Sequence, residues 1–126
     1  MVGYLRLTQN RASIDPNTWF RQVLFSGVRW RPGRFGKSKV EQAFENFRVI
    51  DDGMDLGVMK FRITHDAMRP ENNKHPTTWI HWEELQAYLQ ANSREGWFVE
   101  VERNRQATPP FELRFVKARP SWRPGG

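Results

Sequence analysis

Two stretches of sequence decide the expected fold: Arg48-Val49-Ile50-Asp51-Asp52-Gly53-Met54 and Val58-Met59-Lys60-Phe61-Arg62-Ile63-Thr64. An Asp-Gly pair between extended segments favours a tight hairpin turn. In the second stretch apolar side chains alternate with basic or polar ones, as in a strand that buries one face. Together the two stretches predict an antiparallel pair of strands, 48–50 and 58–64, whose outer face is basic.

A second hairpin is expected further along the chain. Apolar residues alternate with charged ones over 97–102 and again over 111–115, and a turn-rich segment, 104–110, separates them. Opposite charges on facing strands stabilise each other. The residues expected to pair across this hairpin are Glu100, Glu102, Arg103, Glu112 and Arg114.

Helical spacing of apolar residues predicts helices at about 16–25, from 40 to 47, and at about 81–92. Ser38 and Glu41 match a capping box at the start of the second helix, which would carry Val40, Ala43, Phe44 and Phe47 on one face. The segment 65–77 is expected to be a polar loop that begins at His65. A short strand is expected at 4–7.

These elements predict an α+β fold: one domain over residues 1–117, with an antiparallel sheet of four to five strands built from hairpins. Two to three helices are expected on one face of the sheet. A basic loop, 28–39, interrupts the domain, and a basic tail rich in Pro, Gly and Trp, 118–126, follows it.

Composition limits the class of protein. The chain has 126 residues, a net charge of +6 and 38% hydrophobic residues, which is typical of a globular domain with a polar surface. It has no cysteine, which excludes disulfides, thiolate metal sites and a cysteine nucleophile. No secretory signal and no membrane-spanning apolar run are evident. We therefore expect an intracellular, reducing compartment.

The positive charge lies mainly in two short segments. Residues 29–39 contain five basic residues and no acid, and residues 117–126 contain three and no acid. The rest of the chain is slightly acidic. Both segments contain the tetrapeptide Trp-Arg-Pro-Gly, at 30–33 and 122–125. Charge concentrated in this way indicates an anionic partner.

Residue types in these segments suit a phosphate backbone with exposed bases, because Arg and Lys neutralise phosphates and aromatic rings stack on bases. Arg29, Arg31, Arg34, Lys37 and Lys39 are the expected phosphate contacts. Trp30 and Phe35 are the expected stacking residues, and Arg119, Trp122 and Arg123 would extend the footprint. The start of the helix expected at 40–47 would add free backbone amides for an anion. The alternative is that Trp30 and Phe35 fold back as core anchors.

We therefore predict a small, non-enzymatic nucleic-acid-binding protein of low sequence specificity, without a cofactor or metal ion. DNA and RNA, single and double strands, remain open. The alternative function is an assembly subunit or inhibitor that binds an acidic protein surface through the same loop and tail. A third class, a metal-dependent nuclease, requires Asp51, Asp52 and Asp55 to converge with Glu100 or Glu102.

Overall fold

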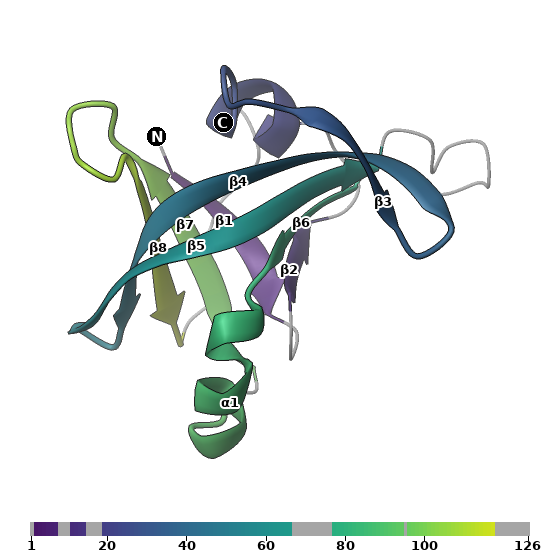
Figure 1. Ribbon diagram of the computed structural model, residues 1–126. Helices are drawn as coiled ribbons and strands as arrows, with labels where there is room; N and C mark the ends of the chain where they lie inside the picture. The colour runs from purple at the N-terminus through teal and green to yellow at the C-terminus, as the bar shows by residue number, and fades with distance from the viewer. Residues whose placement is uncertain (1, 8–10, 15–18, 67–76, 95, 118–126) are drawn as a thin grey trace.

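The computed structural model describes residues 2–7, 11–14, 19–66, 77–94 and 96–117, and these form a mainly β protein with two short helical elements (Figure 1). The strands are β1 (Val2–Leu7), β2 (Arg11–Ile14), β3 (Arg31–Phe35), β4 (Ser38–Asp51), β5 (Met54–Asp66), β6 (Thr77–His81), β7 (Phe98–Arg103) and β8 (Phe111–Val116). The helical elements are the π-helical turn η1 (Phe20–Leu24) and the α-helix α1 (Glu83–Ala91).

The eight described strands form one sheet in the order β3-β4-β5-β6-β2-β1-β7-β8. A further pairing between β4 and β8 joins the far end of this order back to its beginning, so seven strands form a closed ring and β3 stands outside it. The β4–β8 pair is parallel, whereas the other pairs are antiparallel. The sheet is therefore mixed and larger than the expected antiparallel sheet of four to five strands, whereas a mainly β protein with some helix agrees broadly with the expected α+β class. Ring closure leaves few open sheet edges.

The hairpin at Asp52–Gly53 is confirmed, but both of its strands are longer than predicted. β4 and β5 pair continuously from Glu41 with His65 to Asp51 with Met54, apart from one irregularity at Val49 and Ile50. The predicted helix at 40–47 was wrong, because these residues lie within β4. Hydrogen bonding to β5 outweighs the local helical spacing, which is a weak preference by comparison.

The same correction changes the surroundings of the side chains on β4. Ala43 and Phe47 are buried, whereas Phe44 points outward and is 54% exposed. Glu41 forms an ion pair with Arg21 of η1 instead of completing a capping box with Ser38. Residues that were expected on one face of a helix therefore lie on opposite faces of a strand.

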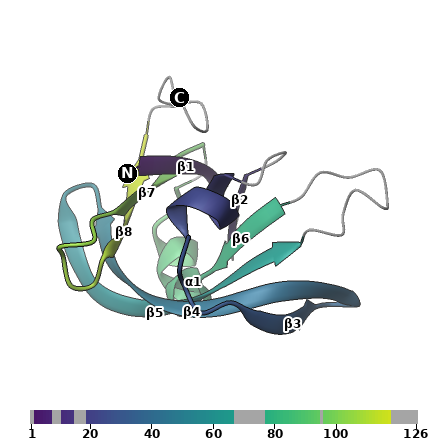
Figure 2. The same ribbon diagram turned by 90° about the horizontal axis from the view of Figure 1, so that it is seen from above.

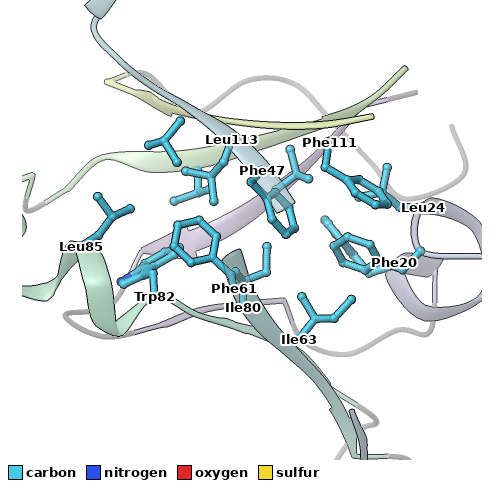
Figure 3. Close-up of a cluster of buried hydrophobic side chains, with 14 of the residues drawn as sticks. Phe20, Leu24, Phe47, Phe61, Ile63, Ile80, Trp82, Leu85, Phe111 and Leu113 are labelled. Carbon is cyan, nitrogen blue, oxygen red and sulfur yellow. The ribbon is translucent and has the colours of Figure 1, made fainter. Parts of the chain in front are cut away.

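The helical elements lie at opposite ends of the closed sheet, not on one face as expected (Figure 1). Buried side chains of η1, including Phe20 and Leu24, enter the core at one end, and Trp82 and Leu85 enter at the other (Figure 3). Between them lie the inward rings of Phe47, Phe61 and Phe111. The predicted helix at 81–92 is confirmed as Glu83–Ala91. Of the segment 16–25, η1 covers Phe20–Leu24, Trp19 before it is also helical, and residues 16–18 lie outside the described part.

The second hairpin is confirmed as the antiparallel pair β7–β8. Val99, Val101, Leu113 and Phe115 are buried, as the alternation predicts. On the outer side Arg114 pairs with the carboxylates of Glu100, Glu102 and Glu112. Arg103 instead donates to the carbonyl oxygens of Leu24 and Ser26, at 2.9 and 2.6 Å. No helix in the described part of the chain is both long and apolar enough to cross a membrane.

Candidate nucleic-acid interface

The basic segment forms a regular hairpin rather than an irregular loop. β3 pairs with the start of β4, from Arg31 opposite Gln42 to Phe35 opposite Ser38, and the hairpin extends beyond the closed part of the sheet (Figures 1 and 2). Gly36, with φ +61°, supplies the left-handed conformation that a two-residue hairpin turn requires. Ser38 begins a strand, so the expected anion site at a helix N-terminus is not formed here.

The five basic residues of this hairpin segment are all exposed. Within the described part of the chain none of them forms an ion pair with a carboxylate. They are Arg29, Arg31, Arg34, Lys37 and Lys39. We name this set the hairpin cations. They carry positive charge that the described residues do not neutralise.

Four arginines outside the hairpin form ion pairs within the described part of the chain. Arg21 pairs with Glu41, Arg48 with Asp55, Arg94 with Asp51, and Arg114 with three glutamates. These arginines stabilise the protein's own carboxylates. The structure therefore separates structural arginines from the hairpin cations, a distinction that the sequence does not show.

Trp30 is held firmly where η1 leads into the hairpin. Its indole Nε1–H donates to the carbonyl of Phe25 at 3.3 Å, and the Arg21 guanidinium lies 4.5 Å from the ring centroid. The side chain also packs against the core cluster. These contacts correspond to the core-anchor alternative for Trp30, although part of the side chain remains accessible. Stacking by Trp30 stays a prediction.

Phe35 also has partners within the protein. Its ring lies 5.3 Å from the ring of Trp79 and 5.3 Å from that of His81, both on β6. The hairpin thereby bends over the outer side of β6. Aromatic contacts at such distances favour packing of Phe35 as an anchor. Its stacking role, like that of Trp30, stays a prediction.

The outer face of β4 and β5 presents an aromatic ring that the sequence reasoning assigned to a helix. Phe44 is directly opposite Arg62, and the neighbouring pair is Asn46 with exposed Lys60. Arg62 is positioned by donating to Gln42 Oε1 at 3.0 Å and to the carbonyl of Arg34 at 2.5 Å. The predicted basic outer face of the 58–64 strand is thus present, with Phe44 beside it. In a strand alternate side chains point to opposite faces, so the inward positions of Ala43 and Phe47 place Phe44 on the outer face. This alternation is the sequence signal for its exposure.

On the opposite face, the base of the hairpin borders an open surface hollow of about 340 Å³. Pro32, Glu41 and His65 are in register on three neighbouring strands and line it. The remaining lining residues are Trp30, Arg31, Lys39 and Val40. His65 was expected at the start of a loop, but it lies in β5 with 2% of its surface exposed. Its Nδ1 is 2.8 Å from Thr78 Oγ1, and burial lowers the pKa of its imidazole.

The carboxylates considered for a nuclease centre are engaged separately. Asp51 is buried and bonded by Arg94 and by the hydroxyl of Tyr88, and the Arg94 hydrogen bonds lower the pKa of Asp51. Asp55 pairs with Arg48, while Glu100 and Glu102 pair with Arg114. No group of three His, Cys, Asp or Glu side chains in the described ranges is placed to share a metal ion. The convergence that the nuclease hypothesis requires is not found there.

Arg119, Trp122 and Arg123 of the tail lie outside the described residues, so their expected contribution stays a prediction.

No family model, curated protein or solved structure matches the chain.

Proposed function

We propose that this protein binds nucleic acid through the phosphate backbone, with the β3–β4 hairpin as the principal contact. The observation that carries the proposal is the set of five exposed hairpin cations that form no ion pair in the described part of the chain. Cations of this kind neutralise phosphates and release the counter-ions condensed on the nucleic acid, which favours binding entropically. The contacts involve no base edge, so sequence selectivity is expected to be low.

A second observation supports the same function. Phe44 is exposed between polar neighbours and lies on one sheet face with Arg62 and Lys60. An accessible ring beside cations is the arrangement on which unpaired bases stack while their phosphates are neutralised. This outer face extends the proposed interface from the hairpin along β4 and β5.

The salt dependence of binding tests the proposal. Five phosphate contacts on a single strand correspond to a slope of about −3.5 in log K against log salt, since each contributes roughly 0.7. Fluorescence anisotropy with labelled single-stranded and duplex oligonucleotides, at about 50 and 200 mM salt, covers the sensitive range. We expect tight binding at low salt and a steep loss at high salt.

The double variant Arg31→Ala/Arg34→Ala should reduce the slope to about −2.1, because two contacts are removed. The matched control is Arg105→Ala/Gln106→Glu, which lowers the net charge equally at two exposed positions of the β7–β8 loop and leaves both the hairpin and the outer face of β4 and β5 intact. Equal losses in both double variants would refute a hairpin-specific interface. Absence of binding at about 50 mM salt would refute the nucleic-acid function itself.

The second candidate function is binding to an acidic protein surface. Exposed Phe44 opposite Arg62 favours it, with exposed Val58 further along the same face, because aromatic residues and arginine dominate protein interfaces. Such an interface depends less on salt than a phosphate contact does. Weak, salt-insensitive association of the protein with the oligonucleotides would therefore support this candidate over the first.

A further inference from the structure

The hollow beneath the hairpin has features of a ligand site that the proposed phosphate contacts do not use. Pro32 is opposite Glu41 in the β3–β4 register, and Glu41 is opposite His65 in the β4–β5 register, so three neighbouring strands contribute to its lining. Its volume, about 340 Å³, lies in the range of roughly 300–1,000 Å³ that small-ligand sites occupy.

The walls of the hollow are held in place before any ligand arrives. Arg21 fixes two of them at once, because its guanidinium bonds the Glu41 carboxylate at 2.7 Å and lies over the Trp30 ring. The Trp30 indole is further held by its bond to the carbonyl of Phe25, and His65 by its contact with Thr78. A preformed site loses little side-chain entropy when it binds, which favours affinity.

The chemistry of the lining suits a planar heteroaromatic ring attached to an anion. Trp30, Pro32 and Val40 provide apolar surface, while the Glu41 carboxylate and the His65 imidazole are polar groups of the same lining. Arg31 and Lys39 also line the hollow and are exposed to solvent. A nucleobase would meet the apolar and hydrogen-bonding groups, and its phosphate would meet the two cations.

We propose that this hollow holds one unstacked nucleobase of a single strand whose phosphates contact Arg31 and Lys39. The inference rests on the proposed function and narrows it from nucleic acid in general to strands with accessible bases. In a duplex the base faces are covered by their stacked neighbours, so a duplex offers only its phosphates to the hairpin.

Filling the hollow without changing the charge tests the inference. Pro32 is exposed on β3, and Pro32→Ile places a larger, strand-compatible side chain in the lining. Ser38→Ile is the matched control, because Ser38 is also exposed on the hairpin but does not line the hollow. The probes are a labelled oligothymidylate and an abasic strand of equal length, both measured by anisotropy at one low salt concentration. Thermal unfolding by circular dichroism shows that each variant is folded.

The native protein should bind oligothymidylate at least about five-fold more tightly than the abasic strand, the lower end for one stacked base. In Pro32→Ile this preference should fall while binding to the abasic strand is unchanged, and Ser38→Ile should keep the native preference. Equal binding of both strands by the native protein, or full preference in Pro32→Ile, would refute the base site alone. Binding of neither strand would refute the proposed function and the base site together.

A measurement on the native protein removes dependence on the variants. Thymidine 5′-monophosphate, titrated at fixed pH, should shift the ring resonances of His65 and the indole resonance of Trp30 in NMR spectra. Inorganic phosphate at the same concentrations should leave the His65 resonances unchanged. Equal shifts with both probes would overturn the base site and indicate an anion site instead.

Discussion

Replacing Asp51 with asparagine should destabilise the protein strongly, because this carboxylate joins three parts of the chain. Asp51 ends β4 and is 1% exposed, and its oxygens accept hydrogen bonds from the Arg94 guanidinium and from the hydroxyl of Tyr88 on α1. Arg94 Nε is 2.9 Å from Asp51 Oδ1, and the second guanidinium nitrogen contacts Oδ2, so the pair is bidentate.

The magnitude follows from what the substitution leaves behind. An asparagine keeps one acceptor oxygen but presents an amide group where Arg94 and Tyr88 both donate. The arginine side chain is 18% exposed and loses its counter-charge in a largely water-excluded place. Breaking one partner of a buried pair costs about 3–5 kcal/mol, and partial access of Arg94 to water brings the expected loss to about 3 kcal/mol. For a domain of this size, that is roughly a 10 °C lower unfolding midpoint.

Urea and thermal unfolding, followed by circular dichroism, measure this loss. Asp55→Asn is the matched control, since Asp55 forms an ion pair with Arg48 at the surface on the same hairpin and should change the midpoint little. If Asp51→Asn unfolds at the native midpoint, the bidentate pair does not stabilise the fold and the reasoning is wrong.

Three further predictions follow from the same structure. Phe44→Ala should weaken binding of single-stranded oligonucleotide by roughly five-fold or more in anisotropy titrations, with an unchanged unfolding midpoint because the ring is exposed; unaltered affinity would exclude the outer face. Gly33→Ala should displace the side chain of Gln42, because its Cδ would lie 2.5 Å from the added Cβ. Gln42 accepts a hydrogen bond from Arg62 Nε–H, so the exchange of that hydrogen with solvent should become faster, and an unchanged exchange rate in NMR spectra would contradict this. The pKa of Asp51 is lowered below its ordinary value of 3.8, so its stabilisation is present above that pH and declines as pH falls through the lower folded value. The stability difference between the native protein and Asp51→Asn should therefore shrink between pH 7 and pH 3 in urea titrations, and a constant difference would contradict the assignment.

Local sequence pattern was sufficient where strand alternation and turn chemistry agree. The Asp52–Gly53 turn, the β7–β8 hairpin and the helix Glu83–Ala91 are all confirmed, because each depends on neighbours in the chain. The segment 40–47 shows the limit of this approach. Val40, Ala43, Phe44 and Phe47 have helical spacing, yet cross-strand hydrogen bonding with β5 places them in a long strand.

The candidate site shows the same division. Clustering of the hairpin cations was evident from the sequence, since it requires only a count of charges along the chain. The sequence did not reveal which arginines have partners, because Arg21 and Glu41 are 20 residues apart and Arg94 and Asp51 are 43 apart. The exposure of Phe44 and the burial of His65 likewise depend on strand register.

By itself the sequence determined the polar composition, two of the hairpins and the concentration of positive charge in residues 29–39. Only the tertiary structure decided that the sheet closes through the parallel β4–β8 pair, that the helical elements lie at its opposite ends, and that Pro32, Glu41 and His65 line one hollow. The physical reason is that turns and alternation arise from contacts between near neighbours in the chain. Closure and the hollow arise from pairing between distant segments, whose register is selected by the burial of the shared core.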